Sequence, residues 1–311
     1  MRLVSGFLIS VVALAASCGG DDGTGEPVGE HYKYVADSAI LPDSTTEKAM
    51  CSLNVDGTGG VDNKLGDIAA TLAQMGFDVQ TSLDTSIDQG SIILLTDMQT
   101  EGFTDAGDAA MRVFIGDMPT PAACTDVNDT VCRKHLTGSA SFSIKAGTPT
   151  NSLVNGDFVG GTFNDTAPGA IALQIALTGS TPIQLDVIGA KAKVTGASAT
   201  NLQQAIFAGA IAKSQVDSEI LPAIADQLAE LIAEDCADLN TPPACGCMAN
   251  STGQQVINLF DADMNCMVTS TELASNGIIA GLLSPDVTIN GTPALSIGIC
   301  TTTAGATFSL Q

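Results

Sequence analysis

The spacing of apolar and polar residues along the chain predicts a mixture of helices and strands. Apolar residues recur at helical spacing from Leu65 to Met75, and Gly76 ends that helix. A compact apolar run at 91–96 is typical of a buried strand. Further strands are expected where apolar residues alternate or cluster between turn residues, around 142–144, 158, 170–177 and 183–194.

The last third of the chain is expected to hold two more helices and a return to strands. One helix is expected to begin at Asn201 and to run through Ile211, and Pro222 opens another. The tail alternates again at 294–299, and a last strand is expected near 306–310. Blocks of strands, then helices, then strands favour an α+β fold: an antiparallel, strand-rich domain with packed helices.

Residues 18–49 have the composition of a flexible acidic tether, because Gly, Asp, Glu, Pro, Ser and Thr dominate and no apolar periodicity is visible. The globular domain is therefore expected to span residues 50–311. Both tyrosines, Tyr32 and Tyr34, fall in the tether, and the chain has no tryptophan. This argues against saccharide binding, which relies on flat amphipathic rings.

The first residues predict export. Arg2 is followed by an apolar run at 3–16 that is too short to anchor in a bilayer, and the run ends in small residues before Cys18. This resembles the lipobox of bacterial lipoproteins, although Ala15 stands where many members have Leu. The resemblance implies a signal peptide at 1–17, lipid attachment at Cys18 and, from Gly19, the outer membrane. The alternative is a plain secretory signal cleaved near Ala16.

The charge balance excludes nucleic acid as a partner. Lys and Arg number 11 against 34 Asp and Glu, and loss of Arg2 with the signal peptide changes the formal net charge from −23 to −24. Such a chain repels nucleic acid and anionic headgroups, and it attracts cations.

The cysteine count indicates disulfides. Of the nine cysteines, Cys18 is assigned to the lipid, and an even number remains for four bridges in an exported chain. These candidates are Cys51, Cys124, Cys132, Cys236, Cys245, Cys247, Cys266 and Cys300. Their connectivity cannot be derived, but Cys124 and Cys132 bracket a short polar loop and are the best local pair. Zinc binding at Cys245-Gly246-Cys247 is the competing interpretation.

One segment, at 261–272, has the donor pattern of a calcium loop. Calcium takes six to eight oxygens, and a twelve-residue loop supplies them from positions one, three, five, seven, nine and twelve. Those positions hold Asp261, Asp263, Asn265, the Met267 carbonyl, Thr269 (directly or through water) and Glu272. With apolar runs on both sides, residues 254–283 resemble an EF-hand helix-loop-helix. The departure is Cys266, where the family has Gly at positive φ; the substitution strains the backbone unless a disulfide fixes the turn.

Two alternatives stay open for calcium. The 261–272 segment is otherwise an acidic turn in which Glu272 caps the second helix. A second candidate loop, with the donors Asn54, Asp56, Thr58 and Asp62, looks like the short D-x-D-G-x-x-D calcium loops of exported bacterial proteins. It is equally well described as a glycine-rich turn leading into the helix at Leu65.

Whole-chain features resemble acidic lipoproteins of predatory and gliding deltaproteobacteria, of myxobacterial type. The resemblance rests on the CGGDDG start, the D-G-x-G-x-x-D-N-x-L-G loop and the D-x-D-x-N-C segment. It implies a lineage and no activity.

No catalytic motif is evident in the sequence. The two histidines are His31, in the expected tether, and His135, expected at the surface beside Arg133 and Lys134. The favoured hypothesis is a non-enzymatic envelope lipoprotein that binds calcium for stability or for an interaction surface. The alternatives are a secreted hydrolase with a structural calcium site and, from the small apolar segments at 205–212 and 278–283, an amphiphile carrier.

Overall fold

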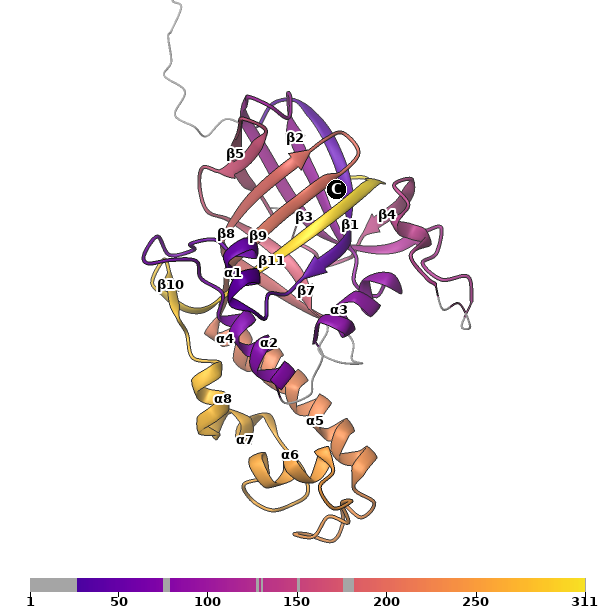
Figure 1. The fold of residues 1–311 in the computed structure, drawn as a ribbon, viewed down its shortest axis with the longest axis vertical. Helices are drawn as coiled ribbons and strands as arrows, with labels where there is room; N and C mark the ends of the chain where they lie inside the picture. Colours follow the sequence, from indigo (N-terminus) through magenta and orange to yellow (C-terminus); the bar gives the residue numbers. More distant parts are fainter. Residues whose placement is uncertain are drawn as a thin grey trace, which may run out of the picture.

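A computed structural model describes most of the chain beyond its N-terminus, and Figure 1 shows its fold. The described residues are 27–74, 79–126, 129, 131–149, 152–175 and 182–310. The signal peptide (1–17), Cys18 and the tether as far as residue 26 lie outside this set. The described fold is α+β, as the sequence predicts: a strand-rich antiparallel sheet with several helices and four disulfides.

The sheet is formed by strands from both halves of the chain. They are β1 (Glu30–Ile40), β2 (Leu94–Thr100), β3 (Ala106–Thr120), β4 (Ala140–Ile144), β5 (Val154–Val159), β6 (Thr162–Asp165), β7 (Gly169–Ile175), β8 (Ile183–Ala197), β9 (Leu202–Ala212), β10 (Val287–Ile289) and β11 (Thr292–Thr307).

Eight of these strands close the sheet into a cylinder. Antiparallel pairing runs from β1 through β2, β3, β5, β6, β8, β9 and β11, and β11 pairs back to β1. Strand β7 pairs with β8, β10 pairs with β11, and β4 bridges β3 and β11. Aliphatic and aromatic side chains such as Met98, Phe163 and Phe207 are fully buried in this closed sheet. At this size side chains can nearly fill the interior, so the sheet has a packed core.

The helices gather at one end of the closed sheet (Figure 1). They are α1 (Thr45–Cys51), α2 (Lys64–Gln74), α3 (Val79–Asp88), η1 (Lys134–Leu136), α4 (Lys213–Gln215), the π-helical turn η2 (Val216–Ile220), α5 (Leu221–Asp235), α6 (Thr252–Phe260), α7 (Ser270–Ser275) and α8 (Gly277–Leu282). Helix α2 packs on β11, and α3 packs on β1. We refer to α5–α8 together as the helical end.

The expected tether is wrong for residues 30–49. Strand β1 lies between β2 and β11, and Tyr34 within it is fully buried with its hydroxyl donating to the Ser198 carbonyl at 2.6 Å. The polar residues of β1 make the segment look like a tether in the sequence. In the structure these residues have partners: Lys33 donates to the Phe308 carbonyl, and His31 contacts buried Asp97. Both tyrosines therefore belong to the folded part of the chain. The argument against saccharide binding assumed that the folded part has no tyrosine, so it no longer holds.

The helix expected from Asn201 is also wrong, because residues 202–212 form β9. Strand β9 pairs with β8 along one edge and with β11 along the other. Residues 205–211 are buried without interruption, so both faces of the strand are covered. A strand buried on both faces is a nearly continuous apolar run, and such a run has no strand-like alternation to distinguish it from a buried helix. The helix expected at Pro222 is confirmed as α5, and the two tail strands are one long strand, β11.

All eight cysteines expected to pair do so. The bridges are Cys51–Cys300, Cys124–Cys132, Cys236–Cys247 and Cys245–Cys266. The predicted local pair is confirmed, and the zinc interpretation of Cys245 and Cys247 is wrong, because both sulfurs are bonded to other cysteines.

Candidate metal centre

The acidic loop, residues 261–272, connects α6 to α7 and includes the first turn of α7. Helix α6 begins after Ser251, whose side chain accepts from the Gln254 N–H, and it buries Val256, Ile257 and Phe260 along one side. Helix α7 begins after Thr269, and Leu273 is fully buried behind it. Apolar contacts on both sides therefore hold the loop between two short helices.

Three carboxylates of the loop converge. Oxygen atoms of Asp261, Asp263 and Glu272 all lie within 4.8 Å of one another. Asp261 is buried, and its two oxygens accept the backbone N–H groups of Asn265 at 3.0 Å and Cys266 at 2.8 Å. The chain therefore wraps around the first carboxylate.

Glu272 links the two ends of the loop. Its Oε1 accepts the Ala262 N–H, and its Oε2 accepts both the N–H and the hydroxyl of Thr269, each at 2.9 Å. Burial of this side chain would raise its pKa, but the hydrogen bonds from Thr269, Asp263 and Ala262 outweigh burial and lower it. The carboxylate is therefore ionised at neutral pH. The expected capping role is also present, since Thr269 and Glu272 form a reciprocal capping box.

The remaining predicted donors lie on the same loop. The Asn265 amide donates to Asp263 Oδ2 at 2.9 Å, and its oxygen accepts the Met267 N–H at 2.8 Å. Met267 has an exposed side chain and offers the loop its backbone alone. Each of the five oxygen-bearing side chains therefore makes a hydrogen bond within the twelve-residue loop.

Cys266 has the positive φ, 68°, that the sequence interpretation required at this turn. Its sulfur is bonded to Cys245, which lies in the loop between α5 and α6. A covalent bond therefore holds a conformation that glycine would adopt without strain. The partner Cys245 could not be assigned from sequence, because nothing in the spacing of the cysteines selects it.

Electrostatics sets this loop apart from the rest of the molecule. No lysine, arginine or histidine follows Lys213 in the chain, so the acidic loop and the helices around it carry acids alone. The ion pairs found in the described part of the chain all involve basic residues at position 213 or earlier. The three clustered carboxylates therefore repel one another without a cationic side chain to offset the repulsion.

The second candidate loop, at 54–62, has a different pattern of hydrogen bonds from that of the acidic loop. Asp62 Oδ2 accepts the Val55 N–H at 2.7 Å, and Asp56 accepts the N–H and hydroxyl of Thr58. These bonds, the one to the Thr58 backbone first, lower the pKa of Asp56. Lys191 already lies here, donating to the Asn54 carbonyl at 2.6 Å. The loop has two acids, Asp56 and Asp62, and cation binding by its four oxygen donors stays a prediction.

The two histidines lie in different surroundings from those expected. His135 is fully buried against the Phe142 ring, so its predicted surface position is wrong. Its basic neighbours Arg133 and Lys134 are exposed, while the imidazole lies beside Gly90 and Ala123. His31 lies in β1, with Nδ1 2.9 Å from an oxygen of Asp97.

Comparisons with known proteins give no further assignment. No family model, no curated protein and no solved structure matches the chain. Within the described residues, the longest helices are too short or too polar to cross a bilayer.

Proposed function

We propose that this protein is a non-enzymatic lipoprotein of the bacterial envelope whose acidic loop binds calcium and thereby stabilises the helical end. The observation that carries the proposal is the convergence of Asp261, Asp263 and Glu272 in a segment of the chain without a basic residue. A bound divalent cation would offset the repulsion among these carboxylates, which backbone N–H groups offset only in part.

The donor set favours calcium over magnesium and zinc. All side-chain donors of the loop are oxygens, from carboxylates, an amide and a hydroxyl, and the loop at 261–272 matches the EF-hand spacing with Cys266 in place of Gly. Calcium accepts many oxygens in flexible geometry, whereas magnesium requires a rigid octahedron and zinc prefers nitrogen and sulfur. The disulfide at Cys266 supports the proposal because it holds the turn whether or not an ion is bound.

The position of the loop suits a protein anchored by its N-terminus. Strand β1 begins at the end of the closed sheet that lies opposite α6 and α7 (Figure 1). With a lipid on Cys18, the helical end would face away from the membrane. There it would meet the calcium of the surrounding medium, and a weak dissociation constant of about 10⁻⁴ to 10⁻³ M would suffice.

Thermal unfolding with and without calcium tests the proposal. Calcium at 10 mM should raise the Tm of the parent protein, and the stabilisation should approach about 2.7 kcal/mol if the concentration reaches 100 times the dissociation constant. Magnesium should do less. Glu272→Gln keeps the side-chain volume but weakens the ligand, so it should lose most of the calcium-dependent gain. The matched control is Glu230→Gln, an exposed residue of α5, which should keep it.

Titration calorimetry gives the second readout, because it reports binding even where the gain in stability is small. If the parent protein neither binds calcium nor gains stability at 10 mM calcium, the loop is an acidic turn and the proposal is wrong. An unchanged calcium response in Glu272→Gln would place the site elsewhere.

A further inference from the structure

An apolar cavity lies at the end of the closed sheet, beneath α2 and α3. It has a volume of about 50 Å³. Its wall is formed by β1, β2, β7 and β11 on the side of the sheet and by the two helices on the other; Ala36, Leu94, Ile297, Ala69 and Leu83 are representative. The cavity is remote in sequence from the acidic loop and uses none of its residues.

The wall of the cavity selects for hydrocarbon. Its side chains are aliphatic except for Gln174, and it contains neither a charged group nor an aromatic ring. Water in such a space would lack the two to four polar partners that it needs, so the cavity is expected to be dry. A methylene chain would recover dispersion contacts that the wall lacks on its open side.

The cavity is too small for such a ligand as it stands. A cavity that holds benzene has a volume of about 150 Å³. The cavity found here has about a third of that volume. An entering chain must therefore displace part of the wall. Of the wall strands, β1, β2 and β11 are hydrogen-bonded to neighbouring strands along both edges. A covering helix therefore moves more readily than these strands.

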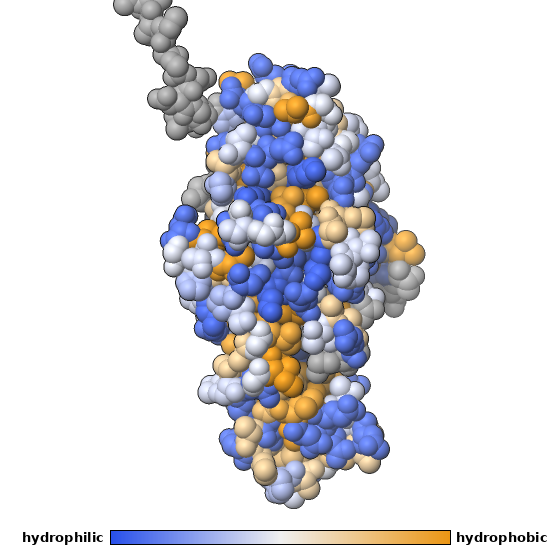
Figure 2. All heavy atoms as spheres, turned by 60° about the vertical axis from the view of Figure 1, so that its left-hand side comes forward, coloured by the Kyte–Doolittle hydropathy of each residue, from blue (hydrophilic) through white to orange (hydrophobic). Residues whose placement is uncertain are grey.

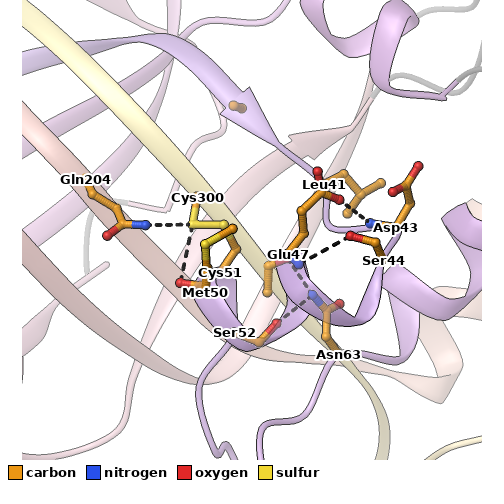
Figure 3. Close-up of a disulfide and its surroundings, with 12 residues drawn as sticks. Leu41, Asp43, Ser44, Glu47, Met50, Cys51, Ser52, Asn63, Gln204 and Cys300 are labelled. Carbon is orange, nitrogen blue, oxygen red and sulfur yellow. Dashed lines mark hydrogen bonds between the residues drawn. A yellow bond between two sulfur atoms is a disulfide. The ribbon is translucent and has the colours of Figure 1, made fainter.

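Helix α2 is attached to the sheet at its first turn. Asn63, just before the helix, donates to the Gly298 carbonyl at 2.8 Å and to Ser52 Oγ at 2.9 Å, and the Lys64 N–H donates to Ser296 Oγ at 2.8 Å. Figure 3 shows Asn63 beside Ser52 and the Cys51–Cys300 disulfide, which fixes this corner. Gly298 permits the approach, since a Cβ there would lie 3.1 Å from the Asn63 amide nitrogen.

Helix α3 is fastened at both ends instead. At its start, Gln80 donates to the Ala39 carbonyl and accepts the Leu41 N–H, both on the chain at the end of β1. At its close, the Asp88 side chain pairs with Arg133, and the Asp88 carbonyl accepts the Arg133 N–H. Among the described residues, the hydrogen bonds from α2 to the sheet are confined to its first turn, so α2 is the freer of the two helices, and its middle carries Ile68 and Ala69 over the cavity.

We propose that this cavity is a binding site for a single aliphatic chain, such as that of a fatty acid or a fatty alcohol. The chain enters by tilting α2 outward about its fixed first turn, and its head group stays outside, because the wall offers no charged partner. The site goes beyond calcium binding and does not depend on it.

Fluorescence titration with 11-(dansylamino)undecanoic acid tests the proposal. The parent protein should bind the probe saturably, and both decanoic acid and decanol should displace it, since the wall recognises the chain and not the head group. Ala69→Leu adds three carbons to the wall from α2, so it should weaken probe binding at least tenfold while the Tm stays equal or rises. Ala280→Leu, the same change at an exposed position of α8, should bind as the parent does.

Ala36→Val, from β1, is the second filling variant in case Ala69→Leu fails to fold. The proposal is wrong if the parent shows no saturable binding, or if a folded filling variant binds the probe as tightly as the parent. Displacement by decanoic acid alone would overturn the hydrocarbon assignment in favour of a carboxylate site. Because the titration is run in EDTA and repeated in calcium, its failure is distinguishable from failure of the calcium proposal.

Discussion

At the scale of single residues, two side chains are held in conditions that they do not favour. Cys266 has a positive φ, and its bond to Cys245 maintains it. His135 is fully buried, and neither of its ring nitrogens has a hydrogen-bond partner among the described residues. An unpaired buried polar group costs about 1–3 kcal/mol of folding free energy. His135 therefore lowers the stability of the fold, and the size of this effect depends on whether the imidazole is protonated.

The pH dependence of unfolding tests this property of His135. Burial lowers the pKa of His135 and Arg133 acts in the same direction, while the Ile87 backbone and Asp88 oppose them. The unfolded chain takes up the proton at about pH 6.5 and the folded one only at lower pH, so stability should fall as pH drops below about 6.5, with a slope approaching about 1.4 kcal/mol per pH unit. His135→Leu should flatten the decline in denaturant unfolding between pH 7.5 and 5.

The matched control is Leu136→Val in the same turn, which should lower stability about equally at every pH. An identical slope in His135→Leu and the parent would assign the decline to other groups.

At the scale of elements, β1 decides whether the sheet closes. It is hydrogen-bonded to β2 along one edge and to β11 along the other, so it joins the N-terminal and C-terminal strands of the chain. It also supplies His31 to Asp97, a carboxylate with no exposure that lies 3.6 Å from Arg112 as well. Without β1, the edges of β2 and β11 would lose their pairing, and buried Asp97 would lose one of its two partners.

A truncation series tests the role of β1. A chain that begins at residue 27 should unfold cooperatively. A chain that begins at residue 42 should lose the cooperative thermal transition and bind a hydrophobic dye such as anilinonaphthalene sulfonate, because the closed sheet is opened. Calorimetry and dye fluorescence check the two outcomes. Equal transition temperatures for the two chains would show that residues 30–40 act as a tether and do not contribute to the cooperative fold.

At the scale of the whole molecule, the two ends have different characters. The basic residues of the described chain all lie at position 213 or earlier, in the closed sheet and in the helices and loops beside it, whereas the helical end is purely acidic and exposes Leu259, Met264, Met267 and Ile278. Figure 2 shows apolar surface in the lower half of the molecule, between hydrophilic areas. If the lipid is attached at Cys18, the acidic, partly apolar end is the one presented to the surroundings.

Anchoring is tested by Cys18→Ser. The resemblance to bacterial lipoproteins implies that the thiol is acylated before the signal peptide is removed, so the serine variant should accumulate as an unprocessed precursor without lipid. Metabolic labelling with palmitate, together with the mass of the product, distinguishes the two forms. Normal cleavage and release of the variant would show that 1–17 is a plain secretory signal.

Features whose determinants are adjacent in sequence were predictable. The helices at 65 and 222 follow from spacing and proline, and the donors of the acidic loop lie within twelve residues. The Cys124–Cys132 pair also closes a short loop. These features require no knowledge of distant contacts, because local backbone geometry alone brings their residues together.

Only the tertiary structure decided the rest. The run at 202–212 is a strand because β8 and β11 pair with its two edges, and β1 is a strand because partners from 95–100 and 300–305 satisfy its backbone. Likewise the partner of Cys266 and the cavity beneath α2 arise from segments far apart in the chain. Pairing and packing between such segments depend on the closed sheet as a whole. Apolar periodicity along the chain does not indicate which distant segments pair.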